Sequence, residues 1–151
     1  MAGDDSLHRK NQLRSECTFN GEEYINLIFS HGTWGGACGA GGMVWKSICR
    51  TETIHQLRFP ENRLILEDEP FGVCVAQRAK LFVYFPEKIY YYRQSNTSLC
   101  KENDFQIRRL NGRQLSLNTC DKLSKPAKLV IFSAYIESVL SLRKKGNYSL
   151  I

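Results

Sequence analysis

The sequence has no pair of cysteines at the short spacing that zinc ribbons and redox motifs need. Its six cysteines are spread along the chain, and no two of them form a C-x-x-C pair. This absence argues against both kinds of site. The first residues also lack a basic segment followed by an apolar run, which is the pattern of a secretory signal. We therefore expect reduced, mostly buried thiols and a cytoplasmic protein.

Several enzyme and nucleic-acid signatures are missing as well. No G-x-S-x-G occurs, so serine-hydrolase chemistry has no support. The glycine-rich stretch over residues 32–42 matches neither common phosphate-binding pattern, so it is either a loop that approaches a ligand or a structural bend. The three histidines are scattered, which does not indicate a metal site. Without an RNP-type or helix-turn-helix pattern, binding to nucleic acid has weak support.

What the chain does have is an uneven distribution of charge. Among its 151 residues, 21 are basic and 15 are acidic. Residues 1–100 contain 11 of each, whereas residues 101–151 contain 10 basic and 4 acidic side chains. This excess predicts an anionic partner surface at the C-terminal end. The apolar segment over residues 129–142 is too short and too polar to span a bilayer, so it is either a helix on an anionic membrane surface or an ordinary buried helix.

The apolar and capping residues predict alternating helices and strands, which is an α/β or α+β chain. Asn20 with Glu23 resembles a capping box at the start of a short helix. Beyond this helix, the sequence predicts a strand over 43–48, a helix capped by Thr51 that ends near Leu57, a helix from about Pro70 to Arg78, strands over 81–85 and 88–92, and helices over 104–118 and 126–145.

Three consecutive carboxylates, Glu67-Asp68-Glu69, follow a brief apolar run and precede Pro70. The end of a strand that passes into a helix is a usual place for catalytic groups in α/β folds. Mutual repulsion raises the proton affinity of one carboxylate, which suits a general base near neutral pH. The alternative is a solvated helix start that the helix dipole favours. Taken alone, the triplet favours this alternative.

Five segments follow one another along the chain in a recognisable order. They are Gly41-Gly42-Met43-Val44-Trp45-Lys46-Ser47-Ile48-Cys49-Arg50, Leu57-Arg58-Phe59-Pro60-Glu61, Leu66-Glu67-Asp68-Glu69, Ala79-Lys80-Leu81, and Tyr90-Tyr91-Tyr92-Arg93 with Thr97-Ser98-Leu99. This succession resembles the second half of family 2 glycosyltransferases, the GT-A fold enzymes of bacterial surface polysaccharide and lipopolysaccharide synthesis. The resemblance covers roughly residues 20–101. It implies a partial GT-A-like α/β fold with C-terminal helices.

The resemblance also implies roles for individual residues. Asp68 falls on the aspartate that acts as general base, and Glu67 would orient the acceptor or the base. Arg93 would approach the diphosphate of the donor. The remaining residues that it assigns would shape the acceptor pocket, and they are Trp34, Gly41, Gly42 and Glu69.

Family members place a nucleotide-binding half before this region, and its D-x-D motif holds Mn²⁺ or Mg²⁺. We identify no ligands for that metal in this chain. We therefore expect three regions, a polar lead-in over 1–19, an acceptor-side region over 20–101, and a basic helical region over 102–151.

The function implied is a truncated or partial glycosyltransferase that transfers a sugar from a nucleotide-sugar to a glycan acceptor with inversion. A separate donor-binding chain would supply the missing half, and a second copy of the chain would cover the edge or apolar face that an incomplete sheet leaves. The basic helices would contact the inner face of the membrane. Two alternatives stay open, a non-catalytic glycan- or partner-binding remnant of the family and a basic nucleic-acid-binding protein.

Overall fold

The fold is given by a computed structural model that describes residues 16–29, 43–87, 90–91 and 104–144. In chain order its elements are β1 (Cys17–Phe19), α1 (Gly21–Phe29), the 3-10 turn η1 (Val44–Lys46), α2 (Thr51–Ile54), α3 (Asp68–Ala76), β2 (Phe82–Tyr84), α4 (Phe105–Thr119) and α5 (Lys125–Lys144). The described part is an α/β chain, mostly helical, with one small sheet.

The capping box that opens α1 is confirmed. The Asn20 side-chain oxygen accepts hydrogen bonds from the backbone amides of Glu22 and Glu23, at 2.9 and 3.0 Å. The Glu23 carboxylate in turn accepts one from the Asn20 amide at 2.8 Å. These bonds satisfy donors that a helix start leaves without an intrahelical partner.

The other helices follow the sequence with shifted ends. Helices α4 and α5 correspond to the two expected over 104–118 and 126–145. Helix α3 begins at Asp68 rather than Pro70, which places two carboxylates inside its first turn. The expected cap at Thr51 is wrong, because Arg50 holds the cap position of α2 and makes no side-chain capping bond.

The sheet differs from the expected strands. Strands β1 and β2 pair antiparallel, with Thr18 opposite Val83, so the segment expected as lead-in contributes a strand. The strand expected over 43–48 is wrong, since this segment forms η1 instead. No other strand in the described ranges is available to pair with it. Strand β2 falls within the expected 81–85, whereas Tyr90 and Tyr91 are not in a strand and 88, 89 and 92 lie outside the described residues.

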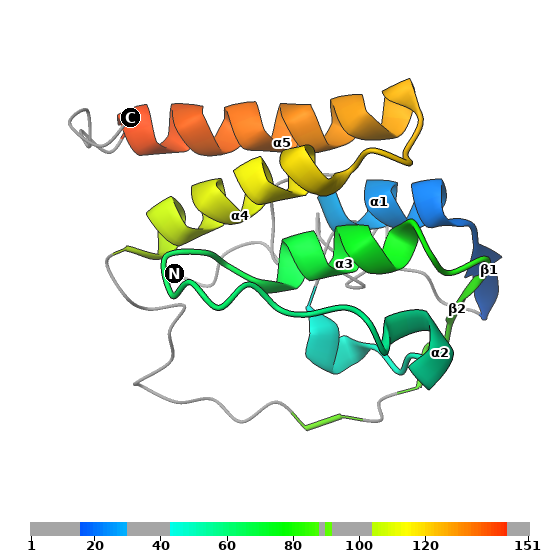
Figure 1. The fold of residues 1–151 in the computed structure, drawn as a ribbon. Coiled ribbons are helices and arrows are strands. Elements are labelled where there is room, and N and C mark those ends of the chain that lie inside the picture. Colours follow the sequence, from blue (N-terminus) through cyan, green and yellow to red (C-terminus); the bar gives the residue numbers. More distant parts are fainter. Residues whose placement is uncertain (1–15, 30–42, 88–89, 92–103, 145–151) are drawn as a thin grey trace, which may run out of the picture.

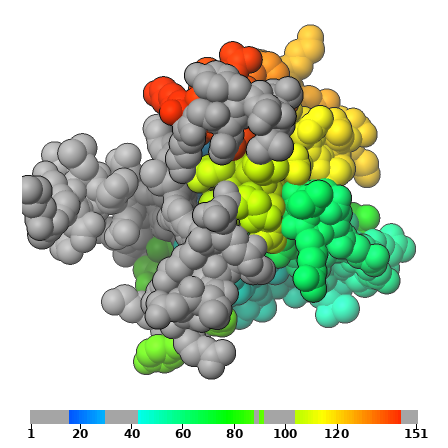
Figure 2. Space-filling model, turned by 90° about the vertical axis from the view of Figure 1, so that its left-hand side faces the viewer, coloured from blue at the N-terminus to red at the C-terminus, as the bar shows by residue number. Residues whose placement is uncertain are grey.

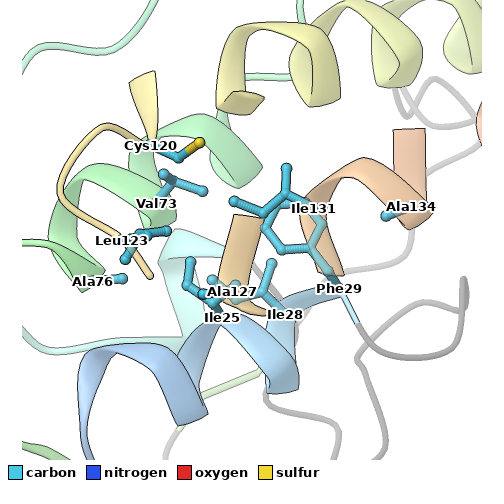
Figure 3. Packing of buried hydrophobic residues seen from close by; sticks show 10 residues of the cluster. All are labelled: Ile25, Ile28, Phe29, Val73, Ala76, Cys120, Leu123, Ala127, Ile131 and Ala134. Carbon is cyan, nitrogen blue, oxygen red and sulfur yellow. The ribbon is translucent and has the colours of Figure 1, made fainter. Parts of the chain in front are cut away.

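The core lies where α1, α3 and α5 meet (Figure 3). Helix α3 is apolar on nearly every side, which is typical of a helix enclosed by others. In Figure 1, α5 runs along one side of the molecule, α4 crosses beneath it, and α1 and α3 lie below. The buried cluster draws on residues before and after position 101, and its members are Ile25, Ile28, Phe29, Val73, Ala76, Cys120, Leu123, Ala127, Ile131 and Ala134.

Two further observations concern the cysteines and the lengths of the apolar helices. The four cysteines in the described part, Cys17, Cys49, Cys74 and Cys120, are free thiols. None of the helices in the described part is both long and apolar enough to cross a bilayer.

Candidate functional site

The chain that leads into α3 is fixed on α4 by backbone contacts. The Leu66 amide donates to the carbonyl of Arg108 at 2.9 Å, and the Asn111 side chain donates to the carbonyl of Leu64 at 2.8 Å. Gly112 allows this close approach, because a Cβ atom there would lie 2.5 Å from the Leu66 oxygen. Figure 2 shows this segment (green) directly against α4 (yellow). The first turn of α3 therefore has a fixed position.

A buried ion pair joins the same turn to two other helices. The Glu69 carboxylate accepts a hydrogen bond from Arg113 Nε at 3.2 Å, and Arg113 is almost fully buried. Arg113 Nη1 also donates to the Ser138 hydroxyl at 2.8 Å and to the carbonyl of Ala134. One guanidinium thus connects α3, α4 and α5. Breaking such a buried pair by removing one partner costs about 3–5 kcal/mol.

Arg109 forms the second ion pair of Glu69, with its Nε atom 3.7 Å from the carboxylate. Burial lowers the pKa of Arg109, and the neighbouring Arg113 charge lowers it further, whereas Glu69 and Glu137 oppose the change. Glu69 was expected to bind the acceptor. The structure instead buries it against two arginines, and it does not line the cleft described below. In the structure, Glu69 joins α3 to α4.

Asp68 has the most strongly perturbed carboxyl group in the described part of the chain. Its pKa is raised from 3.8 to about 6, first by burial and then by the negative charge of Glu67, with Glu69 adding a smaller effect in the same direction. A hydrogen bond from the Val44 backbone opposes this rise. A carboxyl group with such a pKa exchanges protons near neutral pH, which is what a general base requires.

Asp68 faces an open cleft with a volume of about 410 Å³. Glu67 and Arg108 line the cleft with it, as do the segment Phe59–Arg63 and Ile65. Phe59 is held there by its ring, which stacks on Phe71 of α3 with 4.1 Å between the centroids. Two segments that carry the sequence resemblance, Phe59-Pro60-Glu61 and Glu67-Asp68, thus meet at one cleft.

A third segment contacts Asp68, and a fourth contacts this third segment. Turn η1 packs on α3, and its first residue, Val44, is the backbone partner of Asp68. The next residue, Trp45, lies against Tyr90 with 4.9 Å between ring centroids. The Lys46 ammonium lies 5.2 Å from the centre of the Trp45 ring. An aromatic pair therefore lies beside Asp68's contact with η1, with Trp45 on the turn and Tyr90 against it.

The remaining sequence-predicted site residues lie outside the described residues, and they are Trp34, Gly41, Gly42 and Arg93. Three residues that the sequence did not indicate as site residues belong to the site or adjoin it, namely Arg63, Arg108 and Trp45. Trp45 stands within a segment that carries the resemblance, so that segment was the available signal. Nothing local distinguished the two arginines from others.

The described residues do not fit the Mn²⁺ or Mg²⁺ that the resemblance implies. No three histidine, cysteine, aspartate or glutamate side chains within the described ranges converge in a way that could hold a metal ion. The three neighbouring carboxylates diverge, because Glu69 is directed at the arginines of α4 while Glu67 and Asp68 line the cleft. No step below uses a metal.

Comparison with known proteins gives no relative for this chain. The sequence matches no family model and no curated protein, and no solved structure matches it.

Proposed function

We propose that the cleft at the start of α3 is the acceptor side of an inverting sugar-transfer site, in a fold that corresponds to part of GT-A. The proposal rests on the location and the raised pKa of the carboxyl group of Asp68. It lines the cleft, and its pKa of about 6 suits proton transfer near neutral pH. Two of the segments that carry the resemblance line this cleft, and a third contacts Asp68 through the Val44 backbone, which adds support.

In the proposed reaction, an acceptor hydroxyl occupies the cleft within hydrogen-bond reach of Asp68. Its oxygen forms a bond to the anomeric carbon of a nucleotide-sugar while the bond from that carbon to the diphosphate breaks. The diphosphate leaves with the electron pair, and the hydroxyl proton passes to the Asp68 carboxylate and then to solvent. Because attack and departure occur on opposite faces, the configuration at the anomeric carbon inverts.

The neighbours of Asp68 fit supporting roles in this reaction. The charge of Glu67 raises the pKa of the base, so that the carboxylate has a greater affinity for the hydroxyl proton. Arg63 and Arg108 offer donors in the cleft for acceptor hydroxyls or acidic sugars. The ring of Trp45, on the turn η1 that contacts Asp68, offers an apolar platform for a sugar ring.

The experiment is a transfer assay with a panel of nucleotide-sugars and glycan acceptors, with Mn²⁺ present, read by mass spectrometry of the product. Asp68→Asn is expected to lower the transfer rate by about 10²-fold or more, because a positioned general base contributes on that order. Asp121→Asn serves as the matched control, since Asp121 is exposed and away from the cleft. Equal rates for the two variants would refute the role of Asp68.

Binding without transfer is the outcome that separates catalysis from recognition. If NMR titration with glycans shifts the signals of the cleft residues but no nucleotide-sugar gives a product, the family remnant that only binds glycans is favoured. If neither binding nor transfer occurs, the proposed function is wrong. A complementary chain that restores transfer would show that the donor half is supplied separately.

A further inference from the structure

Helix α5 has two apolar faces, and one of them is exposed. Its inner face is buried on the core through Ala127, Ile131, Ala134, Ser138 and Leu142. Its other face carries four large apolar side chains that are exposed by 63, 48, 38 and 50%, namely Leu129, Phe132, Ile136 and Leu140. In Figure 1, the other described helices all lie on one side of α5. We call these four residues the outer stripe.

The spacing of the outer stripe makes it continuous. Its members are three or four residues apart, so successive side chains lie one above another on a single helix face. At 1.5 Å per residue, the stripe extends over about 16 Å. The exposed face of a surface helix is normally polar. A continuous apolar stripe on such a face is typical of an interaction surface.

Basic side chains stand at both ends of the stripe. Lys125 and Arg143 are eighteen residues apart, which is five full helical turns, so they project on the same side of α5 as the stripe. Both are exposed, as are Lys122 before the helix and Lys144 at its end. Asp121 and Glu137 are the acidic residues of the described segment 121–144.

The structure also shows which basic side chains of residues 101–151 are not part of this exposed positive charge. Arg108 and Arg113 are buried, and the side chain of Arg109 is exposed by only 17%. The positive charge that solvent meets in the described C-terminal part is therefore concentrated at the ends of α5 and just before it.

We propose that the outer stripe and its flanking cations form a surface that lies in the plane of an anionic membrane. The four apolar side chains would enter the boundary between headgroups and acyl chains, and the cations would meet lipid phosphates. An anionic bilayer is complementary to both parts, because it offers apolar depth along the stripe and negative charge at its ends. No described helix is suited to spanning, which is consistent with contact in the plane. The proposal does not depend on the sugar-transfer function.

A second copy of the chain fits the outer stripe less well than an anionic membrane does, for electrostatic reasons. An antiparallel pair of α5 helices would bring Lys125 of one copy beside Arg143 of the other. A parallel pair would place each of these cations beside its own equivalent. Either arrangement brings like charges together across the interface, which weakens association.

The experiment is co-sedimentation of the full chain with vesicles of phosphatidylcholine, alone or mixed with phosphatidylglycerol. Binding is expected to the mixed vesicles, to be weaker without phosphatidylglycerol, and to fall as salt is added. Leu129→Ser is expected to weaken binding several-fold, and Phe132→Ser with Leu140→Ser about tenfold or more. Leu81→Ser is the matched control, because Leu81 is exposed by 61% and Leu129 by 63%. It is expected to leave binding unchanged.

Removing the cations tests the second part of the surface. Lys125→Gln with Arg143→Gln is expected to weaken binding about tenfold or more at low salt, since each cation near an anionic surface contributes about fivefold. Circular dichroism and thermal melting establish that each variant is folded. All of these positions are exposed.

Three results would overturn the proposal. The first is equal binding to neutral and mixed vesicles, or no binding to either by the folded chain. The second is equal loss of binding in Leu129→Ser and Leu81→Ser. The third is a dimer in sedimentation velocity that Phe132→Ser with Leu140→Ser converts to a monomer without affecting vesicle binding, which would assign the stripe to self-association.

Discussion

Replacing Asp68 by asparagine should make the protein more stable near neutral pH. The folded-state pKa of Asp68 is about 6, against 3.8 for the free group, so between these values the folded protein holds a proton that the unfolded chain has lost. Stability therefore falls as pH rises over this interval and stays lowered above it. Asparagine has no charge to bury, and its side-chain oxygen can still accept the hydrogen bond from Val44.

The size of the effect follows from the same values. The difference between 3.8 and about 6 is about two pH units, and one unit corresponds to about 1.4 kcal/mol, so the upper limit is about 3 kcal/mol. Asp68 is only partly buried in an open cleft, and solvent reduces the effect there. We therefore expect Asp68→Asn to increase the free energy of unfolding by about 1–2 kcal/mol near pH 8, and by little near pH 4.

Urea unfolding followed by circular dichroism measures the free energy of unfolding near pH 8 and near pH 4. The measurement is made for the native chain, for Asp68→Asn and for the exposed control Asp121→Asn. The control should change stability by less than about 0.5 kcal/mol at either pH. A gain near pH 8 that disappears near pH 4 is the expected signature. Destabilisation by Asp68→Asn near pH 8, or an equal gain at both pH values, would refute the reasoning.

Three further predictions concern the base, the ion pair and the close approach to α4. The transfer rate should rise with pH and level off above about 6, as Asp68 loses its proton, which a pH–rate profile checks. Arg113→Met should lower the free energy of unfolding by about 3–5 kcal/mol, because Glu69 loses its main buried partner, and Glu69→Met in the same chain should recover only part of this loss in urea unfolding, because Arg109 then loses its ion pair with Glu69. Gly112→Ala should destabilise by about 1–3 kcal/mol although alanine favours helices, since its Cβ atom meets the Leu66 oxygen; a higher thermal midpoint would contradict this.

Local signals in the sequence were sufficient to predict the helices whose ends are set by residues close together in the chain. The bonds between Asn20 and Glu23 involve residues three apart, so the start of α1 was readable from sequence. The apolar periodicity of the last third likewise predicted α4 and α5. The segment 43–48 was not predicted correctly, because its apolar residues suit a strand, whereas a contact with Asp68 holds it as a turn.

The candidate site could be predicted only in part for a similar reason. The pattern of Glu67 and Asp68 alone favoured a solvated helix start, and the resemblance assigned them to the site; both line the cleft. The burial of Glu69 could not be foreseen, since its partner Arg113 is 44 residues away and nothing near it in sequence indicates the pairing. The presence of Arg108 in the site could not be foreseen either, because this residue reaches the cleft through the packing of α4 on the segment before α3.

The guanidinium of Arg113 has a mechanical consequence. It joins the carboxylate next to Asp68 to the backbone of α5, so these bonds restrain the movement of the first turn of α3 relative to the helix that carries the outer stripe. If α5 rests on a surface, the same bonds limit how far the cleft can tilt relative to that surface. Molecules that reach the cleft from that surface would then meet Asp68 within a narrow range of orientations set by this connection.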